Sequence, residues 1–189
     1  MVLLAMLRHG DTAWSAEGRI QGRADVPLSD IGRDAIRRLQ LPEACAGMRV
    51  VTSPLARCVE TAALLGAPQA EREPRLLETS WGAWEGRRLA ELRAELGAAM
   101  VENEARGWDF RPERGESPRE VLARLRPWLA GLDAPTLAIT HRGVIRAVYA
   151  SAAGWDLRGK PPAKLAWDAV HLFRVGAGGA PAIERLNLR

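Results

Sequence analysis

Cysteine is nearly absent from this sequence. The 189 residues include only Cys45 and Cys58, which are too few and too irregularly spaced for a disulfide framework or a zinc cluster. We therefore expect two small apolar side chains in a reducing compartment. Long apolar runs are also lacking. The N-terminal run in MVLLAMLRHG stops at Arg8, without the basic residue before it or the cleavage site after it that a signal peptide needs. No segment is long enough to cross a bilayer, and we predict a cytoplasmic protein with no membrane partner.

Lysine is scarce as well, although the chain is basic. Of 27 lysines and arginines only Lys160 and Lys164 are lysines, and the net charge is +4 with an isoelectric point of about 9.8. The arginines are scattered among 23 acidic residues and form no basic tract. This pattern is not typical of a nucleic-acid-binding face, and it favours a surface that attracts small anionic substrates.

The remaining composition is that of a globular protein. Apolar residues make up 47% of the chain, which argues against disorder, and the length suits one domain spanning 1–189. Apolar runs and turn signals predict strands or extended segments at 2–7, 49–53, 70–78 and 136–140, and a C-terminal hairpin within 169–188. Helical patterns lie at 29–40, 55–66, 88–105, from Ser117 onward, and at 143–153. The alternation predicts an α/β fold, a three-layer α/β/α sandwich with a mostly parallel central sheet.

Three of the predicted strands end in residues suited to phosphate chemistry. The first runs into RHG at 8–10, the second into TSP at 52–54 with Arg57 beyond it, and the third into HRG at 141–143. Because ligands gather at the carboxyl ends of parallel strands, we expect these segments to converge on one cleft. The planar fork of arginine matches phosphoryl oxygens, and an imidazole can attack phosphorus.

A proton donor for the departing oxygen is also needed. The carboxylate candidates for this role are Glu78 and Glu85, in LLETSWGAWEG. Glu85 is more typical of a residue that orients a loop. The three histidines of the chain lack the spacing of metal ligands, and we expect His171, inside the C-terminal hairpin, to be structural.

These motifs resemble a known family. LRHGDTAWSAEGRIQGRADVPLSDIG is similar to the signature of the histidine phosphatase superfamily, in its phosphoglycerate mutase-like branch. SPLARCVETA, LLETSWGAWEG, RGESPREV and ITHRGVIRA follow in the order typical of that family, between residue 3 and about residue 150. A lone RHG is weak evidence, whereas ordered blocks are specific. The resemblance implies a phosphoglycerate mutase-like fold, a small phosphorylated substrate, and neither a metal nor an organic cofactor.

The resemblance also implies roles for individual residues. His9 is expected to become phosphorylated, and Glu78 to act as general acid and then as the base that activates water. Arg8, Arg57 and His141 are expected to hold the phosphoryl oxygens. The residues expected around the substrate are Gly10, Ser15, Gln21, Gly22 and Arg142.

Three positions depart from the family pattern. Ser15 stands where Asn is common, which shortens or removes one phosphate contact, and Asp11 replaces a more frequent Glu, which we expect to be tolerated. Arg142 follows the second histidine where a small residue is usual. A large cation there either narrows the pocket or recruits a second anionic group of the substrate.

Two other functions compete with phosphomonoester hydrolysis. A cofactor-dependent phosphoglycerate mutase must shield its phosphohistidine from water, and 189 residues leave little room for a lid. A non-catalytic phosphate-binding regulator has no use for both a nucleophile and an acid.

The segment 154–160, GWDLRGK, has the spacing of a P-loop. We reject that interpretation because Pro161 replaces the magnesium-binding Ser or Thr and because a predicted helix precedes the segment. The substrate itself is not indicated, and the C-terminal hairpin is a predicted contact surface of a homodimer.

Overall fold

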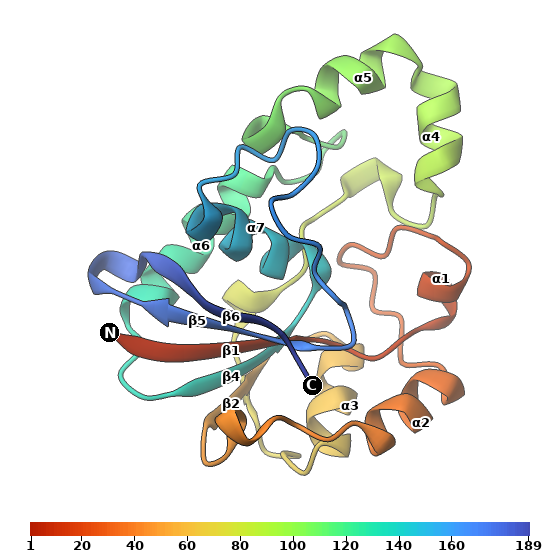
Figure 1. Cartoon of the computed structure of the whole chain (residues 1–189). Coiled ribbons are helices and arrows are strands. Elements are labelled where there is room, and N and C mark those ends of the chain that lie inside the picture. Colours follow the sequence, from red (N-terminus) through yellow and green to blue (C-terminus); the bar gives the residue numbers. More distant parts are fainter.

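A six-stranded sheet forms the centre of the molecule, with strand order β3-β2-β4-β1-β5-β6 (Figure 1). The computed structural model describes residues 1–189. The strands are β1 (Val2–Arg8), β2 (Arg49–Thr52), β3 (Glu71–Arg72), β4 (Thr136–Thr140), β5 (Val170–Val175) and β6 (Pro181–Leu188). The first four are parallel to one another, and β5 and β6 run antiparallel at one side. The predicted mostly parallel α/β sheet is therefore confirmed.

Helices cover both faces of this sheet. Helices α6 and α7 pack on one face, and α2 and α3 pack on the other (Figure 1). The helices are α1 (Ala13–Ala16), α2 (Asp30–Arg38), α3 (Ala56–Leu64), α4 (Leu89–Leu96), α5 (Ala98–Glu104), α6 (Pro118–Ala130) and α7 (Arg142–Ala153). Short 3-10 helices are η1 (Glu43–Cys45), η2 (Pro74–Leu76), η3 (Gly82–Trp84), η4 (Gly107–Asp109) and η5 (Ala177–Gly179). No helix combines the length and the apolar character needed to cross a membrane.

Strand β1 is buried on both faces, which explains its unbroken apolar sequence. Leu4 and Met6 belong to the large core beneath α6 and α7, whereas Ala5 and Leu7 belong to a second core on the opposite face. Successive side chains of a strand point to opposite faces, so both faces here require apolar residues. Burial of one leucine side chain stabilises the fold by about 1.5–3 kcal/mol. His9 thus follows directly on a strand that is buried on both faces.

Side-chain caps form at the start of two of the predicted helices. The hydroxyl of Ser29 accepts a hydrogen bond from the Gly32 amide at the start of α2. At α6, Ser117 and Glu120 form a reciprocal capping box, and Pro118 occupies the first turn. These contacts satisfy amide groups that have no partner inside the helix.

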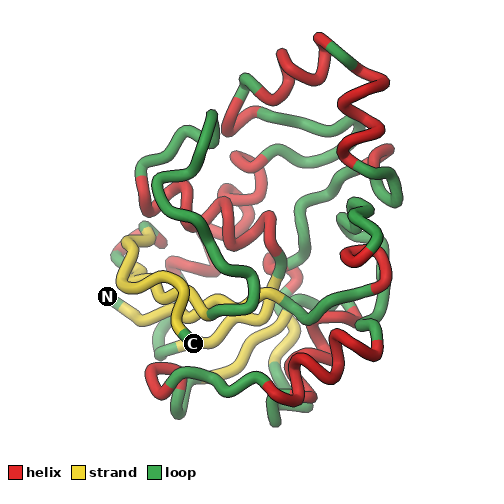
Figure 2. The backbone as a smooth tube through the Cα atoms, turned by 45° about the vertical axis from the view of Figure 1, so that its right-hand side comes forward, coloured by secondary structure: helices red, strands yellow, loops and turns green.

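The single helix predicted over 88–105 is wrong. Gly97 adopts a φ of 50° and a ψ of −121°, and the chain turns there from α4 into α5. Only glycine takes up such a conformation at low cost. The two helices form an arch that projects away from the sheet, at the top of Figure 2.

The extended segment predicted over 70–78 holds for only two residues. Strand β3 pairs with β2 through Glu71 and Arg72. Glu73 then accepts a hydrogen bond from the amide of Arg75, and Pro74 begins η2. This curl ends the strand and carries the chain back toward the end of β4.

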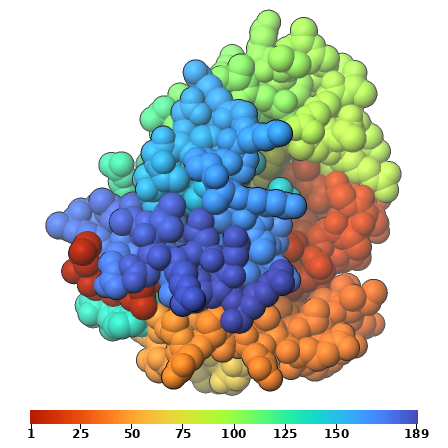
Figure 3. Space-filling model, in the orientation of Figure 1, coloured from red at the N-terminus to blue at the C-terminus, as the bar shows by residue number.

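The C-terminal part of the chain covers one side of the molecule. The predicted hairpin is present as β5 and β6, joined through η5. In Figure 3 the segment before β5, in lighter blue, lies beside the N-terminal segment in red. The irregular stretch 154–169 therefore reaches the edge of the sheet at which β1 ends.

Candidate active site

The three predicted strand ends do come together. Strand β4 lies between β2 and β1. The amide of His9 donates to the carbonyl of Thr140 at 3.0 Å, and that of Ser53 donates to Ile139 at 2.9 Å. The rings of His9 and His141 meet edge to face, with 5.1 Å between their centroids. Parallel pairing thus places both histidines at one edge, as expected.

His9 has a defined tautomer. Its Nδ1 lies 2.7 Å from the carbonyl oxygen of Gly10, and since a carbonyl only accepts, Nδ1 carries the proton and Nε2 keeps its lone pair. Burial, followed by the charges of Arg8 and Arg57, holds the pKa of His9 well below its ordinary value. The ring is therefore neutral near pH 7, the state that a nucleophile requires.

Packing against α2 requires glycine at position 10, a requirement that sequence reasoning did not find. A Cβ built on Gly10 would lie 2.7 Å from Cγ1 of Ile36 and 3.2 Å from the carbonyl of Gly32, both on α2. The amide of Gly10 donates to the hydroxyl of Thr61 on α3 at 3.1 Å. Glycine here lets two helices fix the backbone that in turn fixes the His9 ring.

Arg57 is fully buried, and one of its three side-chain nitrogens has no hydrogen-bond partner. Its Nη1 donates to the carbonyl of Ala24 at 2.8 Å and its Nη2 to that of Gly22 at 2.7 Å. Its Nε is the buried side-chain nitrogen that has no hydrogen-bond partner. Buried polar atoms without partners are rare, and they mark sites of function or of bound ions.

Arg8 is tied to the loop that follows β1. Its Nη1 lies 3.2 Å from Oδ1 of Asp11, and that carboxylate also accepts from the hydroxyl of Ser15 at 3.1 Å. Ser15 further forms a capping box with Thr12 at the start of α1. The Thr12 hydroxyl donates to Oε1 of Gln21 at 2.9 Å. Ser15 and Gln21 therefore shape this loop through contacts within it.

The carboxylate of Glu78 sits at the start of α7. It accepts from the amide of Thr79 at 2.8 Å and from that of Gly143 at 3.1 Å. Burial raises the pKa of Glu78, and the two amides and the Arg57 charge offset only part of that rise. A carboxyl that stays protonated above its ordinary pKa is suited to general acid catalysis.

His141 is held from the side of β2. Its Nε2 lies 2.8 Å from the hydroxyl of Ser53 and 3.5 Å from Sγ of Cys58. Burial, together with the nearby His9 and Arg57, lowers the pKa of His141 well below its ordinary value. Ser53 was not singled out from the sequence, although its place at the end of β2 was the available signal.

Glu85 orients the loop over residues 21–24, which is the kind of role its sequence context suggests. Its carboxylate accepts from the amides of Arg23 at 2.9 Å, Ala24 at 3.1 Å and Trp81 at 3.1 Å. Gly22 has a φ of 52°, and a Cβ there would lie 2.1 Å from Oε1 of Glu85. Arg57 holds the carbonyls of this loop while Glu85 holds its amides.

A second group of residues contacts the backbone of Glu78, and none of its members was singled out from the sequence. Arg23 and Arg124 each approach the carbonyl oxygen of Glu78 at 3.4 Å. Both also pair with Glu116, at 3.3 Å and 2.8 Å respectively. Glu116 lies just before α6 and Arg124 within it, whereas Arg23 lies far from them in the chain, so the group forms only in the folded protein.

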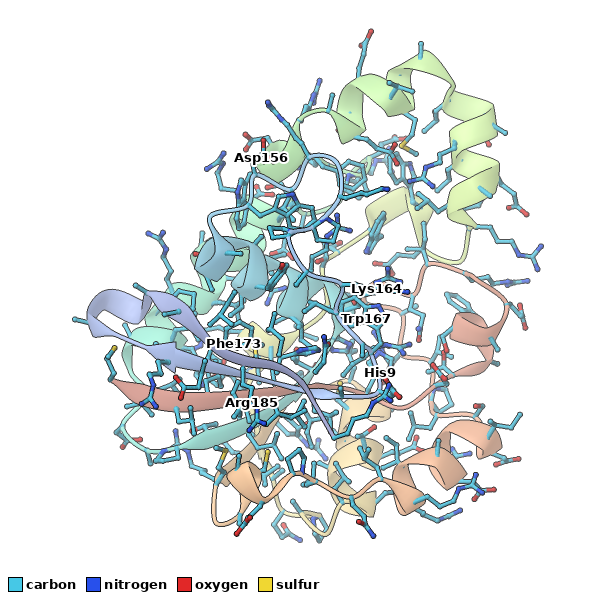
Figure 4. The ribbon with its side chains drawn as sticks, viewed as in Figure 1. His9, Asp156, Lys164, Trp167, Phe173 and Arg185 are labelled. Atoms are coloured by element: carbon cyan, nitrogen blue, oxygen red, sulfur yellow. The ribbon has the colours of Figure 1, made fainter.

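A hollow of about 330 Å³ opens beside His9. Arg8 and Gly10 line it from the end of β1, Ile36 from α2, and Trp167 from the segment before β5. Figure 4 shows Trp167 above His9 at this edge of the sheet. Arg57, Glu78 and His141 do not line the hollow. Arg142, the first residue of α7, lies over the Trp167 ring at 4.8 Å.

Sequence comparison settles the family. Residues 4–189 match the histidine phosphatase superfamily (branch 1). The chain belongs to this superfamily. It is 33% identical over 168 residues to a glucosyl-3-phosphoglycerate phosphatase of Mycolicibacterium vanbaalenii, covering 80% of this chain and 74% of that one. It is 28% identical over 199 residues to a 2,3-bisphosphoglycerate-dependent phosphoglycerate mutase of Azorhizobium caulinodans, covering 97% of each.

Solved structures agree with the sequence match. The protein TTHB049 of Thermus thermophilus superposes with a TM-score of 0.78 at 30% identity, over 100% of both chains. A native mycobacterial glucosyl-3-phosphoglycerate phosphatase gives a TM-score of 0.77 at 25% identity, over 100% of this chain and 99% of that one. The predicted family, fold and enzyme class of this histidine phosphatase are confirmed, and the roles of its individual residues stay predictions.

The remaining chemical groups fall outside this site. No group of three or more His, Cys, Asp or Glu side chains is placed to hold a metal ion. His171 donates through Nε2 to the carbonyl of Ala166 and accepts at Nδ1 from the amide of Asn187, which is a structural role. The segment 154–160 follows α7 and not a strand, so the rejection of a P-loop holds.

Proposed function

We propose that this chain is a phosphomonoesterase in which Nε2 of His9 accepts the phosphoryl group and then passes it to water. The observation that carries this proposal is the bond from Nδ1 of His9 to the carbonyl of Gly10. It fixes the proton on the far nitrogen and leaves a neutral Nε2 with a free lone pair. A buried histidine with only a structural role would use both ring nitrogens, as His171 does.

In the first step, Nε2 attacks phosphorus in line with the bond to the leaving oxygen. The nitrogen–phosphorus bond forms as the phosphorus–oxygen bond breaks, and Glu78 gives its proton to the departing oxygen. The raised pKa of Glu78 keeps that proton available. General acid catalysis of this kind typically contributes about 10²–10⁴-fold to the rate.

In the second step, Glu78 serves as a base. Its carboxylate takes a proton from water while the water oxygen attacks phosphorus. The nitrogen–phosphorus bond breaks, its electron pair returns to Nε2 of His9, and inorganic phosphate leaves. Both reacting groups are then in their starting protonation states.

The phosphoryl oxygens are assigned to Arg8, Arg57 and His141. The unpartnered Nε of Arg57 supports this, because a phosphoryl oxygen is an acceptor that would satisfy it. Its two other nitrogens are held by backbone carbonyls, so this donor is oriented before substrate arrives. Loss of one such preorganised donor typically costs about 10²–10³-fold in rate.

The substrate is proposed to be a small phosphorylated organic acid or sugar derivative, in keeping with the phosphatase relatives. We place Gly10, Ser15, Gln21, Gly22 and Arg142 around it. Ser15 and Gln21 act through the shape of the loop they stabilise. Transfer of the phosphoryl group to another phosphoglycerate is the alternative, since mutases are also among the relatives.

Hydrolysis of p-nitrophenyl phosphate in the presence of EDTA tests the proposal, with wild type and His9→Ala compared at matched circular dichroism. We expect turnover by the wild type and its loss in His9→Ala. Turnover that survives the substitution would contradict the proposal. Phosphoryl exchange from 2,3-bisphosphoglycerate to 3-phosphoglycerate, without net release of phosphate, would favour the mutase.

The assembly and location of the protein are also proposals from its sequence. We propose a homodimer that forms through the hairpin of β5 and β6, because β6 is the long outer strand of the sheet. Light scattering of wild type and Ile183→Lys tests this, since Ile183 is partly exposed on β6. We also propose a cytoplasmic location, on the basis of the sequence.

A further inference from the structure

Arg142 differs from most arginines of this chain in having no acidic partner. No carboxylate lies within 4.0 Å of its guanidinium, whereas the other active-site arginine at the surface, Arg8, pairs with Asp11. Its contact is with the Trp167 ring, 4.8 Å from guanidinium carbon to ring centroid. Stacking on an indole holds a guanidinium in place and leaves its edge free to donate.

The position of this stacked pair ties it to the reaction centre. Arg142 directly follows His141 and opens α7, and Trp167 lines the same hollow as His9 and Arg8. Partial burial and the charge of Arg8 lower the pKa of Arg142, and the charge of Glu78 raises it. The guanidinium therefore lies within electrostatic reach of the phosphate-binding side and of the acid.

The proposed function assigns the transferred phosphoryl group to residues other than Arg142. In the proposed function the phosphoryl oxygens are held by Arg8, the free Nε of Arg57 and His141. The charges of both arginines act on His9, and the His141 ring lies 5.1 Å from the His9 ring, centroid to centroid. A further arginine without an acidic partner, stacked on a residue that lines the hollow beside His9, suits a different anion. Its planar fork can form two parallel hydrogen bonds with a carboxylate or with another phosphate.

We propose that Arg142, held by Trp167, is a second anion-binding subsite that selects phosphomonoesters carrying another anionic group in the portion that leaves. The proposal rests on the proposed phosphatase function of the same site. A charge-assisted hydrogen bond contributes about 1.5–3 kcal/mol, which corresponds to roughly 10–100-fold in affinity.

Pairs of compounds that differ in one anionic group provide the test. 3-Phosphoglycerate is compared with glycerol 1-phosphate, and fructose 1,6-bisphosphate with fructose 6-phosphate. Each is measured as a substrate, or as a competitive inhibitor of p-nitrophenyl phosphate hydrolysis. The quantity of interest is the ratio of KM or Ki values within a pair, because a general loss of activity cancels from it.

Arg142→Gln should lower the preference for the anionic member of at least one pair by about 10-fold or more. The first pair reports a carboxylate partner and the second a phosphate partner. Arg142→Lys should give an intermediate loss, since it keeps the charge without the fork, and Trp167→Leu should shift the ratio in the same direction. Arg146→Gln is the matched control, because Arg146 lies one helical turn away over Trp155 at 5.0 Å and also lacks an acidic partner.

Two outcomes would overturn the subsite and one would overturn the function beneath it. Unchanged ratios in Arg142→Gln, or an equal change in Arg146→Gln, would show that Arg142 recognises no second anion. A folded wild type that hydrolyses neither p-nitrophenyl phosphate nor any of the four compounds would instead contradict the phosphatase proposal. The two failures are thus distinguished by the activity of the wild type.

Discussion

The amide of Gly143 donates to the carboxylate of Glu78 at 3.1 Å, so the proposed acid caps the helix that follows the second histidine. The contact joins the segment after η2 to the start of α7. The partial positive charge at a helix N-terminus stabilises a carboxylate, while burial opposes its ionisation. The balance of these two effects sets the protonation state on which the mechanism depends.

Gly143→Ala should displace that acid. The added Cβ would lie 2.4 Å from Oε1 of Glu78 and 2.3 Å from Oγ1 of Thr79. We expect kcat/KM for an alkyl phosphate to fall about 10²–10⁴-fold, the range for loss of a general acid. The fall for p-nitrophenyl phosphate should be smaller, since its leaving group needs a proton less. Gly176→Ala is the control, because its nearest contact would be at 3.7 Å, and equal losses for both substrates would argue against displacement of an acid.

Gly22→Ala should displace the loop over residues 21–24, which the proposed function places beside the substrate. Its Cβ would meet Oε1 of Glu85 at 2.1 Å, and the residue has a φ of 52°. We predict a loss of activity together with about 1 kcal/mol of backbone strain. Gly18→Ala has a similar φ of 69° and nothing within 4 Å, so it should lose stability without losing activity. Comparable kcat/KM values for the two variants would contradict the role given to this loop.

The pH profile of kcat/KM should have an acidic limb below the ordinary pKa of histidine and an alkaline limb above the ordinary pKa of glutamate. Activity should fall on the acidic side only well below the ordinary pKa of histidine, because burial lowers the pKa of His9. It should fall on the alkaline side above the ordinary pKa of glutamate, because burial raises the pKa of Glu78. Glu78→Gln should abolish the alkaline limb, and ionisation of the substrate is common to both proteins. An alkaline limb that persists unchanged in Glu78→Gln would assign that limb to another group.

The pH dependence of the free energy of unfolding should also report the raised pKa of Glu78. A carboxyl whose pKa is raised by folding binds its proton more tightly in the folded chain than in the unfolded one. Its contribution is complete below the unfolded pKa and is lost as pH rises through the folded pKa. Relative to wild type, the free energy of unfolding of Glu78→Gln should therefore increase with pH across that window. Urea denaturation at a series of pH values measures this, and a difference independent of pH would contradict the raised pKa.

The sequence predicts the histidine pair because strand topology alone brings it together. Apolar runs ending in RHG and HRG place His9 and His141 at the same edge of any parallel sheet, and their rings do meet there. Helix starts at Ser29 and Ser117 are also local, because each cap depends on residues within one turn.

The features that sequence reasoning missed depend on contacts between distant segments. Arg23 and Arg124 meet at the carbonyl of Glu78, and both pair with Glu116, only once the loop that holds Arg23 packs against the segment of Glu78 and the start of α6. The stacking of Arg142 on Trp167 likewise joins α7 to a stretch without regular structure. The break at Gly97 was overlooked because Ala, Leu and Glu around it favour one continuous helix.

Identification of the phosphorylated residue tests the account most directly. Wild type, His9→Ala and Glu78→Gln are mixed with a radiolabelled phosphomonoester, quenched in alkali and mapped by mass spectrometry, since phosphohistidine is stable to alkali and labile to acid. The account predicts label on His9 in wild type, more persistent label in Glu78→Gln because water is activated slowly, and none in His9→Ala. Turnover without labelled His9, or label on another residue, would contradict it.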